Sequence, residues 1–219
     1  CTALFPMSET GLMLKSHWTP RYVVNRLMLS RYQRAHPEAP WLTRTMIDFL
    51  SGYLRSTDVL VEFGSGRSTM WFARRTAHVI SAEHNEQWHA HVTKELAAKG
   101  LKNVTYLRVE RTPESYIAPV DAALAAHSPD GKADVILVDG INRDHAAMWA
   151  LAHIRPGGLI LVDNVNRHLP HPTHAPASLR ADGPPDGPLW QKFSDATASW
   201  RRTWTSDGVT DTAGFFAPH

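Results

Sequence analysis

The stretch Asp58-Val-Leu-Val-Glu-Phe-Gly-Ser-Gly-Arg-Ser-Thr69 decides how this chain is expected to fold. Val59 to Val61 form a short apolar run rich in β-branched residues, which predicts a strand buried on both faces. Glu62 closes the strand, two glycines follow, and the apolar spacing becomes helical from Ser68 onward. A strand, a glycine turn and a helix in this order let the backbone approach a nucleoside-bearing ligand closely.

Predicted strands and helices alternate along the rest of the chain. Further strands are expected at residues 78–83, 103–109, 133–139 and 159–162, with helices at 85–99, 113–127 and 142–154. This alternation implies right-handed crossovers and a mostly parallel sheet with helices on both faces, which is a Rossmann-like, three-layer α/β sandwich. Near the C-terminus a helix is expected at 189–199. Two short runs flanking Ser206-Asp-Gly208 then predict an antiparallel hairpin at the sheet edge.

The chain divides into an N-terminal part, residues 1–55, and a core, residues 56–219. The N-terminal part is predicted to hold a loose arm and two helices, beginning near Pro20 and Pro40, that pack on the core. Residues 165–188 of the core are rich in proline and histidine, which predicts a long lid loop. Met7 is an alternative start, which would leave residues 1–6 outside the native chain.

Composition limits the classes of function. The 23 Lys and Arg residues are dispersed and the net charge is +2, so nucleic-acid binding has no electrostatic support. No run approaches the roughly 18 apolar residues of a membrane span and no leader is visible, so we expect a cytoplasmic protein without a membrane partner. The lone cysteine, Cys1, excludes an internal disulfide and a cysteine-based zinc site.

Acidic residues stand at or just past the ends of five predicted strands. They are Glu62, Glu83, Glu110, Asp139 and Asp163, the last followed by Asn164. Ligands of an open parallel sheet bind beyond the carboxyl ends of its strands. A single acid there is often only a helix cap, but five in succession would line one edge with negative charge. This edge suits a cationic cofactor better than a pyrophosphate.

Two features distinguish between the nucleoside cofactors that the turn could hold. Glu83 is placed to accept both hydroxyls of a ribose, which NAD and S-adenosylmethionine share. However, Thr69 stands where a dinucleotide-binding turn has its third glycine. Glu62, just before the turn, would repel a pyrophosphate and attract an ammonium or a sulfonium. An NAD(P)-dependent oxidoreductase remains the alternative.

The whole set of features resembles the class I S-adenosylmethionine-dependent methyltransferases over about residues 56–217. The resemblance rests on Glu62-x-Gly64-x-Gly66, Glu83, Asp139, the stretch from Pro156 to Asn164 and the closing hairpin. It implies a seven-stranded sheet whose last strand is antiparallel, with S-adenosylmethionine as the cofactor. The cofactor-binding residues implied are Glu62, Gly64, Ser65, Gly66, Ser68, Glu83, His84, Glu110, Arg111 and Asp139.

Methyl transfer from a sulfonium requires the enzyme to align an acceptor and to remove its proton. A general base is one device, and Asp139 and His145 are the candidates, with Asp144 between them. We expect the acceptor to be a small molecule, and most simply a hydroxyl oxygen.

A divalent cation that lowers the pKa of the acceptor hydroxyl is the second device. Asp139, Asp163 and Asn164 resemble the metal triad of the catechol and caffeoyl-coenzyme-A O-methyltransferases, and three oxygen ligands suit magnesium. The lysine that those enzymes carry after the first aspartate is absent, since Asn142 and Arg143 stand here.

A third alternative is a non-catalytic protein that only binds S-adenosylmethionine. An acceptor pocket closed by residues 165–188, or an Asp139 locked in a salt bridge with Arg143, would indicate it. A homo-oligomer is compatible with the sequence.

Overall fold

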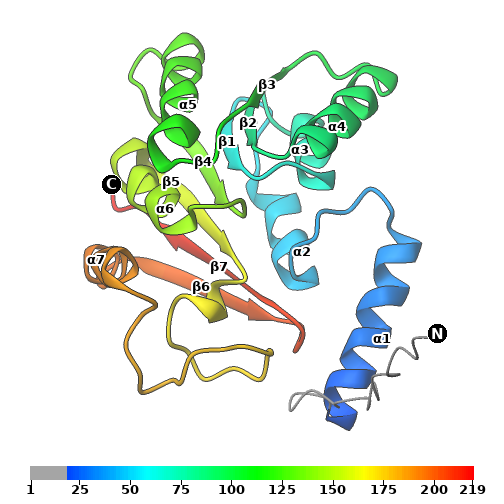
Figure 1. Cartoon of the computed structure of the whole chain (residues 1–219), viewed down its shortest axis with the longest axis vertical. Coiled ribbons are helices and arrows are strands. Elements are labelled where there is room, and N and C mark those ends of the chain that lie inside the picture. Colours follow the sequence, from blue (N-terminus) through cyan, green and yellow to red (C-terminus); the bar gives the residue numbers. More distant parts are fainter. Residues whose placement is uncertain (1–18) are drawn as a thin grey trace, which may run out of the picture.

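The computed structural model describes residues 19–219 as a seven-stranded sheet covered by helices on both faces (Figure 1). The strands are β1 (Val59–Phe63), β2 (His78–Glu83), β3 (Val104–Arg108), β4 (Ala133–Val138), β5 (Ile154–Asp163), β6 (Arg201–Ser206) and β7 (Asp211–Phe216). Their order is β3-β2-β1-β4-β5-β7-β6. β1 to β5 pair in parallel, and β7 runs antiparallel to both of its neighbours. The fold class predicted from the sequence is confirmed. The predicted N-terminal arm lies outside the described residues.

Two layers of helices enclose the sheet. The helices are α1 (Pro20–Ala35), α2 (Arg44–Tyr53), α3 (Arg67–Ala73), α4 (Glu86–Ala98), α5 (Pro113–His127), α6 (Arg143–His153) and α7 (Pro188–Ala196), with a 3₁₀ turn, η1 (Val165–Arg167). Buried side chains of α5, α6 and α7 pack on one face of the sheet, and those of α2, α3 and α4 on the other. No helix within residues 19–219 combines the length and the apolar content needed to span a bilayer.

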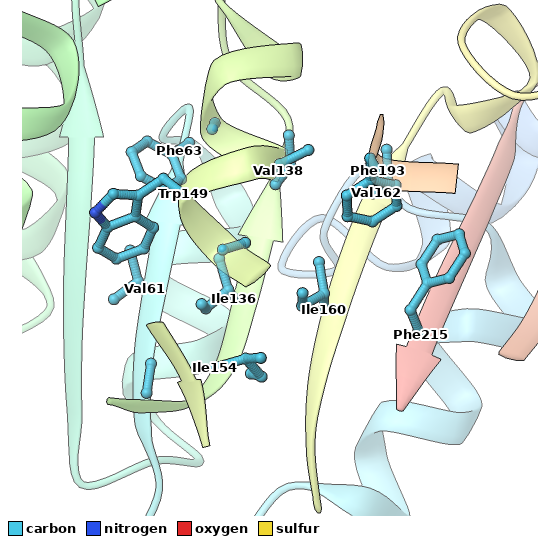
Figure 2. Close-up of a cluster of buried hydrophobic side chains, with 14 of the residues drawn as sticks. Val61, Phe63, Ile136, Val138, Trp149, Ile154, Ile160, Val162, Phe193 and Phe215 are labelled. Carbon is cyan, nitrogen blue, oxygen red and sulfur yellow. The ribbon is translucent and has the colours of Figure 1, made fainter. Parts of the chain in front are cut away.

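Alternation along β1 places Glu62 beneath α3. Val61 and Phe63 point toward α6, where the ring of Trp149 packs edge-on against Phe63 with centroids 5.2 Å apart (Figure 2). Successive side chains of a strand point to opposite faces, so Glu62 must point the other way. It meets Thr69 of α3 on that side.

The fifth strand is longer than predicted. It begins at Ile154 rather than Leu159, because the Pro156-Gly-Gly158 segment is an irregularity within the strand and not the turn that its composition suggests. The pairing shifts between Ala133 and Val135, and Gly157 adopts a positive φ of 76° there. A glycine tolerates this backbone geometry without strain.

The two N-terminal helices differ in how they meet the core. α2 buries Met46, Ile47 and Leu50 against the sheet, and it begins at Arg44 rather than near Pro40. α1 buries none of its residues, and in Figure 1 it lies beyond α2, away from the sheet. Its four arginines are spread around the helix and interrupt any apolar stripe. The expected packing on the core therefore comes mainly from α2, and α1 contributes Tyr32, which is partly buried against the same cluster.

Candidate active site

The turns that follow β1 and β4 touch each other. Gly64 has a φ of +95°, and a Cβ added there would lie 2.6 Å from the backbone nitrogen of Gly140. The backbone of Asp139 donates to Phe63 O at 2.9 Å, which holds the two strand ends in register. Only glycine meets both requirements at position 64, a positive φ and no side chain.

Glu62 is fully buried below this turn and is anchored by two hydroxyls. Its Oε2 accepts hydrogen bonds from Thr69 Oγ1 at 2.5 Å and Ser81 Oγ at 2.6 Å. Burial raises the pKa of Glu62 to about 7, although Ser68, Ser81 and Thr69 favour the ionised form. Oε1 is buried and has no hydrogen-bond partner among the described residues. A buried carboxylate oxygen in this state fits a cationic ligand group.

Thr69 has a role that the sequence pattern did not reveal. Its hydroxyl accepts from the backbone nitrogen of Gly66 at 3.0 Å while donating to Glu62. The residue that replaces the third glycine therefore ties the glycine turn to the buried acid.

Glu83 binds the same turn from β2. Its Oε2 accepts from the backbone nitrogen and hydroxyl of Ser65, at 3.3 and 3.0 Å. Its Oε1 accepts from Asn85 N at 2.7 Å and lies 3.2 Å from His84 Nδ1. Both predicted residues, Glu83 and His84, thus lie at the rim of the turn.

Aromatic side chains that were not predicted surround Ser65. The hydroxyl of Tyr106, in β3, lies 2.6 Å from Ser65 Oγ, and its ring stacks on His89 at 4.3 Å. Trp88 Nε1 donates to Ser65 O at 2.8 Å. The signal for Tyr106 was available in the sequence, as an aromatic residue inside the third strand. Its contact with Ser65 depends on the pairing of β2 with β3.

Glu110 and Arg111 follow β3 and are both exposed. The carbonyl of Arg111 accepts from Asn142 Nδ2 at 2.8 Å, so this loop reaches the edge where β4 ends. Their assignment to the cofactor stays a prediction.

The predicted metal ligands come together at the ends of β4 and β5, around the guanidinium of Arg143. Arg143 Nη2 donates to Asp139 Oδ1 at 2.8 Å, and Nη1 donates to Asn164 Oδ1 at 3.2 Å and to Asp163 O at 2.6 Å. The Asp163 carboxylate turns away, accepting from Thr212 Oγ1 at 2.7 Å. As arranged, these residues do not fit a divalent cation, because a cationic side chain lies among their oxygens. Within residues 19–219, no group of three or more His, Cys, Asp or Glu is arranged to hold a metal ion.

The acids at these strand ends repel one another. Desolvation raises the pKa of both Asp139 and Asp163, and Asp163 is raised further by the charge of Asp139. Glu62 and Glu83 add to the negative field at Asp139, and Arg143 opposes it. Several carboxylates with one guanidinium among them make an edge that favours a cationic ligand.

The remaining histidine candidates lie apart from one another. His145 is half-buried in the first turn of α6, where its backbone nitrogen donates to Asp144 Oδ1 at 2.9 Å. In the lid, His168 stacks on Trp190 and lies 3.4 Å from Asp186 Oδ2, whereas His171 stacks on Trp204. Within residues 165–188, η1 is joined to the loop that follows it, since Asn166 Nδ2 donates to Pro176 O at 3.1 Å.

Comparison with known proteins matches residues 61–165 to the methyltransferase domain family. The search of curated proteins gave no significant match. Among solved structures, a Staphylococcus aureus protein provisionally named as a caffeoyl-CoA O-methyltransferase is 16% identical, with a TM-score of 0.57 over 87% of this chain and 91% of that one. A methyltransferase-like protein from Silicibacter pomeroyi is 18% identical, with a TM-score of 0.53 over 83% and 90%. A methyltransferase from Pyrococcus furiosus is 16% identical, with a TM-score of 0.52 over 89% and 99%.

At these identities the solved structures show a shared fold, and the domain match assigns residues 61–165 to a family. The matched residues run from β1 through the glycine turn to the end of β5, which is the part that gathers the buried acids. Residues 61–165 form a methyltransferase domain, and the fold of the chain is shared with solved methyltransferase structures.

Proposed function

We propose that this enzyme transfers the methyl group of S-adenosylmethionine to a hydroxyl oxygen of a small molecule. The observation that carries the proposal is the carboxylate of Asp139, which stands at the end of β4 beside the glycine turn. Its Oδ1 is held by Arg143, whereas Oδ2 accepts no hydrogen bond within residues 19–219 and the side chain is 28% exposed. A small acceptor agrees with the dispersal of the basic residues along the sequence.

The cofactor fits the residues present. Glu62, with an unpartnered buried oxygen, would bind the ammonium of the methionyl part, and Glu83 would bind the ribose. Gly64 and Gly66 would let the backbone pass beneath it. When bound, S-adenosylmethionine supplies a methyl group already activated by its sulfonium.

Asp139 is the better candidate for the general base. Burial raises the pKa of its carboxyl above the usual value, so the ionised form takes up a proton more readily than an ordinary aspartate. Arg143 fixes its orientation through Oδ1 and leaves Oδ2 for the proton. His145 is the second candidate and lies six residues after Asp139, in the first turn of α6.

The same ion pair is what a non-catalytic S-adenosylmethionine-binding protein would show. Asp139 and Arg143 do form the salt bridge that would indicate it, at 2.8 Å. Turnover separates the two functions, because a non-catalytic protein binds the cofactor and makes no methylated product. The cytoplasmic location and a homo-oligomeric state stay predictions from the sequence.

The test is a methyl-transfer assay with isotopically labelled S-adenosylmethionine. Panels of small phenols and alcohols, amines and thiols would be compared, with product mass as the measurement. We expect label on an oxygen acceptor. Transfer only to nitrogen or sulfur would refute the hydroxyl assignment, and no transfer to any acceptor despite tight cofactor binding would favour the non-catalytic alternative.

Cofactor affinity is expected to depend on pH through Glu62. Its pKa is raised to about 7 in the unliganded protein, so it is largely protonated below that pH and cannot pair with the cofactor's ammonium. Affinity for S-adenosylhomocysteine should therefore increase with pH by up to about tenfold per unit below pH 7, and level off above it. The unliganded protein itself should lose stability as pH rises through this range, since the folded state binds the proton more tightly than the unfolded chain.

Calorimetry across this pH range would test the assignment with two variants. Glu62→Gln should reduce the slope of the logarithm of affinity against pH by about one. Asp211→Asn is the matched control, because Asp211 is also fully buried but lies in β7 and accepts from Trp204 Nε1. An unchanged slope in Glu62→Gln would show that Glu62 does not bind the ammonium.

A further inference from the structure

The guanidinium of Arg143 has each of its five N–H donors directed at an oxygen. Beside the three bonds described above, Nε donates to Gly140 O at 2.9 Å and Nη2 to Asp139 O at 2.6 Å. The acceptors are three backbone carbonyls, one carboxylate oxygen and one amide oxygen, all at or just past the ends of β4 and β5. A guanidinium has five N–H donors, so the side chain is saturated.

The backbone conformation near the ends of both β4 and β5 directs these oxygens at Arg143. Asn142 and Asn164 adopt left-handed conformations, with φ of 48° and 49°, and asparagine tolerates this region better than most residues. The left-handed turn at Asn164 comes directly after Asp163, whose carbonyl accepts from Arg143. Asn164 Nδ2 also donates to Thr210 Oγ1 at 2.5 Å, which orients the amide so that its oxygen faces Arg143.

Carboxylate, amide and carbonyl oxygens are the groups that bind magnesium and calcium. In this structure these oxygens accept hydrogen bonds from the guanidinium of Arg143. The side chain of Arg143 is only 18% exposed, so it is not a loosely held surface group. A divalent cation could bind Asp139 and Asn164 only after Arg143 had left.

We propose that Arg143 is the resident cation of this site, that it positions Asp139 and the ends of β4 and β5, and that the enzyme binds no divalent metal there. Arg143 has no donor left for the acceptor, so it is a positioning residue. The proposal rests on the methyl-transfer function but not on the chemical nature of the acceptor.

Removing the guanidinium should create a metal site. In Arg143→Ala the oxygens of Asp139 and Asn164 lose their cation, and we expect the variant to bind Mn²⁺, used as a paramagnetic probe for a magnesium-type site. The wild type should not bind it at millimolar concentration. Arg143→Lys keeps a positive charge in the same place and should exclude Mn²⁺ as the wild type does.

The measurement is Mn²⁺ titration followed by electron paramagnetic resonance, with S-adenosylhomocysteine binding as the check that each variant is folded. Mn²⁺ binding by the wild type, displaced by magnesium and lost in Asp139→Asn, would overturn the proposal. So would a folded Arg143→Ala that binds no more Mn²⁺ than the wild type. If Arg143→Ala fails to fold, Arg143→Gln removes the charge with less change in volume. The wild-type titration tests the absence of a metal site without either variant.

The Mn²⁺ titration measures metal binding in the absence of any methyl acceptor. A failed acceptor assay would therefore leave the proposal about Arg143 standing, and a Mn²⁺ site in the wild type would leave the methyl-transfer function standing.

Discussion

Asp139→Asn is expected to lower kcat for methyl transfer by about 100-fold to 10,000-fold, the usual contribution of a general base. The asparagine keeps an oxygen in the position of Oδ1, so Arg143 retains its 2.8 Å acceptor and the ends of β4 and β5 stay in place. What is lost is the basicity of the carboxylate. Affinity for S-adenosylhomocysteine should change much less than kcat.

Asp134→Asn is a matched control for this change. Asp134 lies on the same strand at its opposite end, where it pairs with Arg155 and accepts from the backbone nitrogen of Val59 at 2.8 Å. We expect this variant to lose some stability and little activity. A fall in kcat no larger for Asp139→Asn than for Asp134→Asn would contradict the assignment of the base.

Gly64→Ala is expected to lower the free energy of unfolding by about 3 kcal/mol. About 1 kcal/mol comes from placing a Cβ on a backbone with positive φ, and about 2 kcal/mol from the overpacking that the Cβ causes. The added atom would lie 2.6 Å from Gly140 N and 2.7 Å from Gly140 Cα, and neither backbone atom can rotate away. Because the turn must shift to relieve this contact, cofactor affinity should fall as well.

Gly100→Ala separates the two causes. Gly100 also has a positive φ, 64°, but nothing lies within 4 Å of a Cβ placed there. It should lose only the backbone part, about 1 kcal/mol, and keep its affinity for S-adenosylhomocysteine. Chemical denaturation and calorimetry of both variants would test this. Equal losses for the two variants would show that the contact between the β1 and β4 turns is not tight.

The order and type of the elements followed from the sequence because the local patterns and the tertiary fold agree. Buried strands carry β-branched runs, and glycines and prolines stand between elements. The exception is β5, where Pro156-Gly-Gly158 has the composition of a turn but lies within a strand. Pairing with β4 continues the strand past this segment. A local sequence pattern does not contain that pairing.

The site was predictable as a set of strand ends but not as a set of contacts. A parallel sheet brings its carboxyl ends to one edge, so Glu62, Glu83, Asp139 and Asp163 could be placed there from the sequence alone. The five bonds of Arg143 depend on side-chain direction and on two left-handed asparagines. In the sequence, Arg143 stood out as a departure from a metal-site pattern and as a candidate salt-bridge partner of Asp139. In the structure its guanidinium lies at the centre of that site.

The central claim is that the glycine turn and the acids around it bind a cationic methyl donor. Isothermal titration calorimetry of the wild type at pH 8 with S-adenosylmethionine, S-adenosylhomocysteine and NAD would test it most directly. The account predicts binding of both sulfur compounds and none of NAD. Binding of NAD without binding of either sulfur compound would contradict it.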